Sequence, residues 1–315
     1  MSLLKQAVIL ERNEWPDTQS LRVQIRNALE EHLQKESDVL ALAEFGSRAV
    51  GTHDELSDMD FLCIVAAVEG KENEEKRAAI LFTILKNIFE KELGMSIELE
   101  HEDLWEECMG NYQRFLRFKS TGENPVLPTL LIDFSFAFKA AMWKKFSTPE
   151  QHGIFCILFD KKNLISPDPP EFDVEKHAEN MMNDLKSMIT RFGIFQSYIG
   201  KELLRNHHLG ARYYYDELTL NPLVQVLNMK YQPLRYFFKL RYAHHFGFPQ
   251  ELIETLESLY FVATPQELCE KQKIAVELFY VTVDEILARD NLALLEDLAK
   301  NSREAARNAF RSITA

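Results

Sequence analysis

The stretch that decides the fold reads Phe45-Gly46-Ser47-Arg48 and, after a short polar segment, Ser57-Asp58-Met59-Asp60-Phe61. Residues 39–45 form an apolar run that predicts a strand, and residues 61–67 predict a second one. Glycine at the end of the first strand lets the backbone approach a ligand closely. The serine that follows can offer N–H and hydroxyl donors at the start of a helical turn.

Asp58 and Asp60 predict a cation site at the start of the second strand. Residues i and i+2 of a strand point to the same face, so the two carboxylates can be directed at one point. Two carboxylates this close repel each other unless a cation lies between them. Such ligands suit Mg²⁺, which takes one or two protein carboxylates and completes its shell with substrate phosphates. The alternative is a glycine-serine turn followed by a solvated acidic strand start; the ordered composite on two predicted strands favours the metal site.

A third acidic residue, Asp133, lies in another apolar run that predicts a strand. The apolar residues on either side alternate toward one face, and Asp133 points to the other face. An ionised carboxylate inside an apolar strand costs several kcal/mol unless it is paired or binds a metal. Glu98 and Glu100, on a predicted strand over 96–100, compete for this role, but the neighbours of Asp133 are more apolar. The other interpretation of Asp133 is a salt bridge to a core arginine or lysine.

The composition limits the kinds of partner. The chain has 315 residues, enough for two domains, and 49 acidic against 36 basic residues give a net charge of −13. No block of lysine and arginine is visible, so the charge argues against nucleic acid and favours a cationic small molecule. Glu98 and Glu100 could form an acidic rim for such an acceptor; a solvated edge is the commoner outcome.

The same composition predicts a cytoplasmic protein. The four cysteines are far apart and lack the spacing of metal ligands, as expected for reduced thiols inside a cell. We expect no signal peptide, and no run reaches the roughly 18 apolar residues that a membrane span needs.

The second half of the sequence has a helical pattern. The proline-rich segment at 166–170 lacks several N–H donors and predicts a boundary between domains at residues 1–168 and 169–315. Asp173 is the expected cap of the first helix of a bundle. Further helices are expected over 194–206, 208–220, 222–246 (which Pro233 can kink), 249–260, 265–289 and 291–312, the last capped by Asn291.

Lys201 and Arg205 form a cationic pair in the helical half. They lie at i and i+4, on one face of a helix, where two cations could grip a triphosphate. A solvated helix face is the alternative, and spacing alone does not separate the two interpretations.

Three passages together resemble the nucleotidyltransferase superfamily with the DNA polymerase β-like fold, and within it the aminoglycoside 6-adenylyltransferases, the streptomycin-modifying type. They are Gly46-Ser47-Arg48-Ala49 with Ser57-Asp58-Met59-Asp60, Leu131-Ile132-Asp133-Phe134-Ser135 with Leu158-Phe159-Asp160-Lys161, and Tyr198-Ile199-Gly200-Lys201-Glu202-Leu203-Leu204-Arg205. The resemblance implies an α+β N-terminal nucleotidyltransferase domain, with a mixed sheet flanked by helices, followed by an all-α helical-bundle domain.

The resemblance also implies roles for individual residues. Asp58 and Asp60 would hold Mg²⁺, and Asp133 would be a third ligand or the general base. The residues implied to lie by the nucleotide are Gly46, Ser47, Arg48, Lys201 and Arg205. The family usually continues with acidic residues after the last of these, whereas Asn206-His207-His208 stand here, so the catalytic match is better than the substrate match.

The activity expected from these features is the transfer of AMP from ATP to a hydroxyl of a small, cationic, aminoglycoside-like acceptor, with Mg²⁺ and release of pyrophosphate. One alternative is an enzyme of the same fold that modifies a protein or RNA, as antitoxin-like modules do. The other is a non-catalytic relative that binds nucleotide. The absence of a basic patch argues against RNA, and the presence of all three carboxylates argues against a decayed site.

Overall fold

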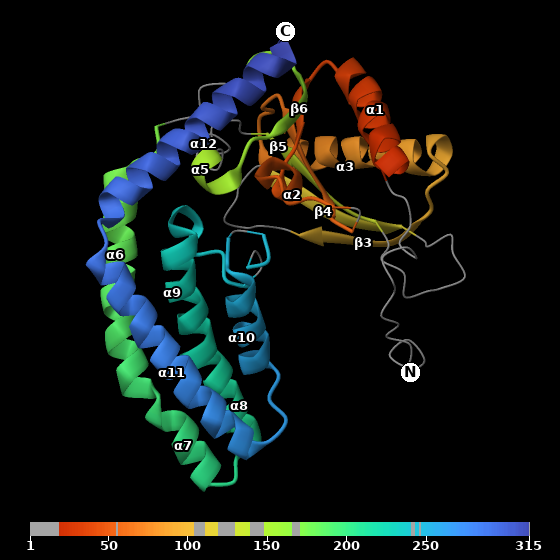
Figure 1. Cartoon of the computed structure of the whole chain (residues 1–315). Helices are drawn as coiled ribbons and strands as arrows, with labels where there is room; N and C mark the ends of the chain where they lie inside the picture. The colour runs from red at the N-terminus through yellow and green to blue at the C-terminus, as the bar shows by residue number, and fades with distance from the viewer. Residues whose placement is uncertain are drawn as a thin grey trace. The chain divides into compact units, whose positions relative to one another are not determined.

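Six strands form one mixed sheet in the N-terminal part of the chain, in the order β3-β4-β5-β2-β1-β6 (Figure 1). The strands of this computed structural model are β1 Val39–Glu44, β2 Met59–Val65, β3 Ile97–Asp103, β4 Asn111–Phe118, β5 Leu131–Ala137 and β6 Cys156–Asp160. β2 and β5 pair in parallel, and the other neighbouring strands pair antiparallel. The expected mixed sheet is therefore confirmed.

The structure describes residues 19–54, 56–103, 111–118, 130–138, 148–165, 171–240, 243–245 and 247–314, with side chains up to residue 305. The chain divides into two units, Met1–Pro170 with Ala305–Ala315 and Glu171–Glu304. The proline-rich segment expected at the domain boundary, residues 166–170, lies outside the described residues.

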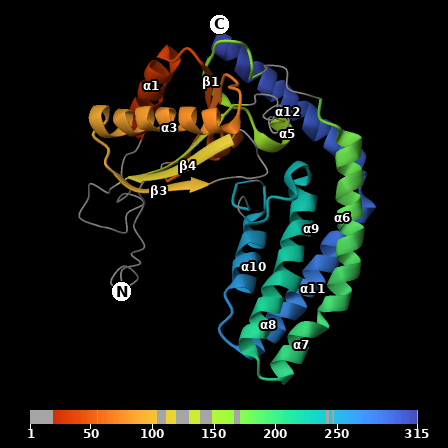
Figure 2. The ribbon, with the colours of Figure 1, turned by 180° about the vertical axis from the view of Figure 1, so that it is seen from behind.

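Two helices, α1 (Gln19–Lys35) and α3 (Lys71–Asn87), cover one face of the sheet (Figure 2). Their apolar residues recur at helical spacing and bury themselves against alternate residues of the strands, because one face of a strand repeats every second residue. The residues at this interface include Ile25, Leu29 and Leu33 from α1, Leu81 and Leu85 from α3, and Phe61, Phe134 and Phe136 from the strands. α3 continues into a π-helical turn, η2 (Ile88–Glu92).

The opposite face carries smaller residues and two short helices, α2 (Gly46–Val50) and α5 (Pro149–His152). Alanines from β1 and β2's Leu62 and Ile64 pack here with Ala49 of α2. The segment after α5 is fixed to α2, because the N–H of Ile154 donates to the carbonyl of Ala49 at 2.8 Å. The small side chains leave room for α2 close to the sheet.

The second unit is helical, which confirms the expected bundle. Its helices are α6 Val174–Phe195, α7 Ser197–Leu204, α8 His208–Tyr215, η3 Asp216–Leu220, α9 Asn221–Tyr231, η4 Pro233–Arg235, α10 Gln250–Tyr260, α11 Pro265–Ala288 and the first part of α12. α12 spans Asn291–Thr314, and its residues from Ala305 onward belong to the first unit. Asp173 caps α6 by accepting from the N–H of Lys176 at 2.8 Å, as predicted. Its core includes the parallel stack of Phe192 and Phe279, whose ring centroids are 3.7 Å apart.

Two expectations about the helices were wrong. The single helix over 222–246 ends at Tyr231, and Pro233 begins the short 3₁₀ turn η4, because proline lacks the N–H of the helical ladder and its ring clashes with the preceding turn. Asn291 is not the cap of α12. Asp290 takes that role by accepting from the N–H of Ala293 at 3.1 Å, and Asn291 instead donates to the carbonyl of Ile286.

Candidate active site

Asp60 and Asp133 are direct neighbours across the parallel pair of β2 and β5. Paired residues in a sheet project to the same face. The neighbours of Asp60 and Asp133 along the two strands, Met59 and Ile132, are buried in the core under α1 and α3. The two carboxylates therefore lie on the other face, and both are partly buried. Asp58 precedes β2 by one residue and is exposed.

The turn at Gly46 lies directly against the carboxylate of Asp60. Gly46 has φ +62°, and a β-carbon placed on it would lie 1.7 Å from Oδ2 of Asp60. The backbone reinforces this approach, since the N–H of Phe45 donates to the carbonyl of Asp60 at 2.9 Å. Only glycine satisfies both the conformation and the contact. Ser47 and Arg48 follow in α2, so the turn that the sequence predicted to face a ligand begins beside the acid.

Gln113 on β4 fixes the carboxylate of Asp133. Its Nε2 donates to both Oδ1 and Oδ2 of Asp133 at 2.7 Å. An amide is neutral, so it orients the carboxylate without changing its charge. The sequence held no signal for this residue. A glutamine on a strand is an ordinary surface residue until the register of β4 with β5 is known.

Arg48 contacts a histidine at the end of the same turn. Its Nη1 donates to Nε2 of His53 at 2.7 Å. Partial desolvation of the ring lowers the pKa of His53 below its usual value, and the charge of Arg48 lowers it further. A neutral His53 can accept this bond, so the pair holds the guanidinium beside the glycine turn.

The donor set of these acids suits a metal that arrives together with a nucleotide. Within the described part of the chain, no group of three His, Cys, Asp or Glu side chains is placed to hold a metal ion alone. Asp60 and Asp133 are nevertheless adjacent hard oxygen donors on one face. Mg²⁺ needs only one or two protein carboxylates when substrate phosphates supply further ligands.

The structure does not bring Glu98 and Glu100 to this site. β3 is the edge strand beyond β4, and Glu100 pairs in register with Leu116, whose side chain lies in the core under α1 and α3. Glu100 forms ion pairs with Lys86 of α3 and with Arg114. Glu98 pairs with Arg117 at 2.7 Å. Both carboxylates are thus engaged by basic residues of the same unit.

Lys201 and Arg205 lie in the helical unit, on α7 and directly after it. Arg205 pairs with Glu202 at 2.6 Å, and His207 contacts the other oxygen of the same carboxylate at 2.9 Å. Nζ of Lys201 lies 5.0 Å from the ring centroid of Tyr198. Each cation therefore has a partner within its own segment.

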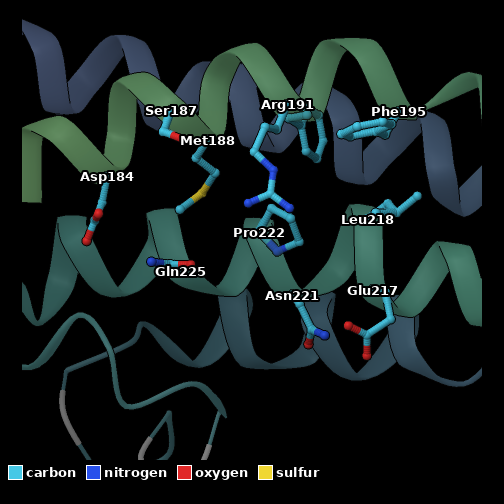
Figure 3. A pocket seen from close by; sticks show the side chains of 11 residues that line it. Asp184, Ser187, Met188, Arg191, Phe195, Glu217, Leu218, Asn221, Pro222 and Gln225 are labelled. Atoms are coloured by element: carbon cyan, nitrogen blue, oxygen red, sulfur yellow. The ribbon is translucent and has the colours of Figure 1, made fainter.

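The helical unit also contains a cavity of about 330 Å³ between α6 and the η3–α9 segment (Figure 3). The guanidinium of Arg191 extends from α6 into the space above Pro222. The lining residues are Asp184, Ser187, Met188, Arg191, Phe192, Phe195, Glu217, Leu218, Asn221, Pro222 and Gln225. Lys201 and Arg205 are not among them.

A comparison of the sequence with known protein families identifies a domain in the first unit. Residues 22–108 match the model of the nucleotidyltransferase domain. The chain carries a nucleotidyltransferase domain. The match runs from α1 through β3 and includes the glycine turn, Asp58 and Asp60, while Asp133 follows it in the chain. As a nucleotidyltransferase, the protein is expected to use a nucleotide and an acceptor.

Other comparisons add little to this assignment. The sequence matches no curated protein. Among solved structures, an aminoglycoside 6-adenyltransferase from Bacillus subtilis is similar at 14% identity over 89% of this chain and 96% of that chain, with a TM-score of 0.34. No helix among the described residues is both long and apolar enough to cross a membrane.

Proposed function

We propose that this nucleotidyltransferase moves AMP from ATP to a hydroxyl of a small cationic acceptor, with Mg²⁺, and releases pyrophosphate. The observation that carries the proposal is the adjacency of Asp60 and Asp133 on one face of the sheet, with the Gly46 turn against Asp60. Two acids and a close-approach backbone turn are the parts that phosphoryl chemistry requires, because its catalysis depends on positioning and charge neutralisation.

The residues have separate tasks in this proposal. Asp58 and Asp60 would hold the metal, which when bound neutralises charge on the phosphates. Asp133, oriented by Gln113, would accept or orient the proton of the acceptor hydroxyl. That oxygen then bonds to the α-phosphorus while the bond from this phosphorus to the oxygen bridging to the β-phosphate breaks, and pyrophosphate leaves. Gly46, Ser47 and Arg48 would lie by the triphosphate.

The choice of a cationic acceptor is supported by the net charge of −13, which favours the approach of cations. Glu98 and Glu100 add no support, since basic residues already engage them. The assignment of Lys201 and Arg205 to the phosphates, the choice of ATP and the cytoplasmic location remain predictions from the sequence.

A pyrophosphate-release assay tests the proposal. The protein is incubated with ATP and Mg²⁺ alone, with aminoglycosides, with neutral polyols of similar size, and with a protein extract. We expect release with polyamino sugars and little release with neutral polyols. A radiolabel from [α-³²P]ATP that appears on proteins instead would identify the protein-modifying alternative. No release in any arm would refute the transfer of AMP from ATP.

The same assay with Asp60→Asn tests the site itself. We expect turnover to fall by at least about 10²-fold, the loss typical of one electrostatic group at a transition state, while the melting temperature changes little. Glu72→Gln, in an exposed i,i+4 pair of α3, is the matched control and should retain full turnover. Unchanged turnover in Asp60→Asn would rule out the proposed mechanism.

A further inference from the structure

Arg22 of α1 is a buried cation whose guanidinium reaches the loop that carries Asp58. Its side chain is only 3% exposed. Nη2 donates to the carbonyl oxygen of Ser57, the residue directly before Asp58. An arginine is rarely buried this deeply without compensation. The charges of Glu44, Asp54 and Asp58 offset part of the cost of burying it.

One turn further along α1, Arg26 contacts the end of β1, the strand that leads into the glycine turn. Its Nε and Nη2 donate to the two carboxylate oxygens of Glu44 at 2.6 and 3.2 Å. Glu44 is 2% exposed and is the last residue of β1, two positions before Gly46. The two arginines lie at i and i+4 on one helix face, so α1 contacts both the strand before the glycine turn and the loop before Asp58.

We propose that Arg22 is a positioning residue that sets the direction of Asp58 toward the metal, and that Arg26 does the same for the glycine turn through Glu44. The inference rests on the proposed function, because it assumes that Asp58 holds a metal. A carbonyl of Ser57 fixed by a buried guanidinium leaves the next residue little backbone freedom. Supporting groups of this kind typically change metal affinity by 10–100-fold.

A purely structural role is the alternative, and Arg77 provides the matched comparison. Arg77 is also partly buried and forms two ion pairs, with Glu36 at 2.7 Å and Asp38 at 2.5 Å, just before the start of β1. It therefore fixes the opposite end of the same strand. Arg77→Met should lower stability as Arg22→Met does, but it should leave the metal site unchanged.

The test measures metal binding directly. Mn²⁺ serves as the probe for the metal site, and its free concentration is followed by electron paramagnetic resonance in the presence of ATP. The Mn²⁺ bound by the same ATP without protein is subtracted, and the measurement covers the wild type, Arg22→Met, Arg22→Lys and Arg77→Met. We expect Mn²⁺ affinity to fall about 10-fold or more in Arg22→Met, less in Arg22→Lys, which keeps the charge, and less than twofold in Arg77→Met. In turnover, saturating Mg²⁺ should largely restore the rate of Arg22→Met.

Hydrogen exchange gives a second readout that does not depend on activity. The amides of residues 56–60 should exchange faster in Arg22→Met than in Arg77→Met. Each variant is measured at a temperature the same number of degrees below its own melting temperature. If Arg22→Met does not fold, Arg22→Lys carries both measurements. Equal Mn²⁺ affinity and equal exchange in Arg22 and Arg77 variants would overturn the positioning role alone. A wild type that binds no Mn²⁺ with ATP would overturn the proposed function as well.

Discussion

A β-carbon on Gly46 would lie 1.7 Å from Oδ2 of Asp60, so the carboxylate occupies the space that a side chain at position 46 would need. No side-chain movement short of displacing the carboxylate can make room at that distance. The glycine turn is therefore a condition for the position of Asp60, which explains in physical terms why the two parts of the composite occur together.

Substitution of Gly46 by alanine should inactivate the enzyme by moving Asp60. The positive φ of +62° adds backbone strain of about 1–2 kcal/mol to the cost of the clash. Gly94→Ala is the matched control, since Gly94 has φ +65° and no atom within 4 Å of an added β-carbon. Urea unfolding and pyrophosphate release should show destabilisation in both variants but loss of activity only in Gly46→Ala. Similar activity in the two variants would contradict the coupling of turn and acid.

Removal of the Gln113 amide should weaken catalysis without unfolding the protein. Gln113→Met keeps the length of the side chain but removes the two hydrogen bonds that the amide donates to Asp133. We expect turnover to fall by about 10–100-fold, as for other groups that orient a ligand or base. Gln24→Met, on the exposed side of α1, is the control. A turnover equal to that of the control would show that Asp133 needs no orientation.

The ion pairs of Arg77 should stabilise the protein only above the acidic range. The hydrogen bond from Arg77 holds the pKa of Asp38 below its usual value near 3.8. Stabilisation from this carboxylate is complete above that value and is lost as pH falls through the lower pKa of the folded state. Arg77→Gln should cost about 1–2 kcal/mol at pH 7, allowing for solvent screening, and progressively less below about pH 4. Urea unfolding from pH 3 to 7 measures the difference, and Lys35→Gln, in an exposed pair, should change little. A difference that is constant with pH would argue against the pair.

His177 should make the helical unit less stable in mild acid. Burial lowers the pKa of His177, whose Nε2 contacts the carbonyl of Pro233 at 2.8 Å. The unfolded chain therefore takes up a proton near pH 6.5 that the folded chain does not, so stability falls as the pH drops below that value. One such group contributes at most about 1.4 kcal/mol per pH unit. His177→Gln should flatten the dependence between pH 7 and 5 in thermal unfolding, and an unchanged slope would contradict this origin.

The acids of the candidate site could be identified in the sequence from the i and i+2 spacing of Asp58 and Asp60 and from the apolar surroundings of Asp133. Asp133 lies between apolar strand residues, where an ionised carboxylate is costly unless it is paired or binds a metal. Gln113 and Arg22 could not be found in this way, because their roles depend on which strand lies next to which and on the position of α1. Neither an amide nor a helix arginine is unusual until those neighbours are known.

Two differences between the sequence expectations and the structure have equally specific causes. Glu98 and Glu100 share the alternation typical of a strand, but the register of β3 changes between Ile97 and Leu99, and pairing with β4 directs Glu100 to the face covered by α3. Pattern alone cannot assign a face to an edge strand. The helix expected over 222–246 ends at Tyr231, because Pro233 stops the helix and does not merely bend it.

The parallel pair of β2 and β5 also has a consequence for folding. β1 pairs with β2, β3 pairs with β4, and β5 enters between β2 and β4 to join the two hairpins. A growing chain that has reached only β4 can form both hairpins from nearby residues. It still lacks Asp133, the residue that pairs with Asp60 across β2 and β5. Since distant pairings form slowly, the face that carries Asp60 and Asp133 should be among the last parts of the sheet to assemble. A folding intermediate could therefore have most of its strands in place and still be inactive.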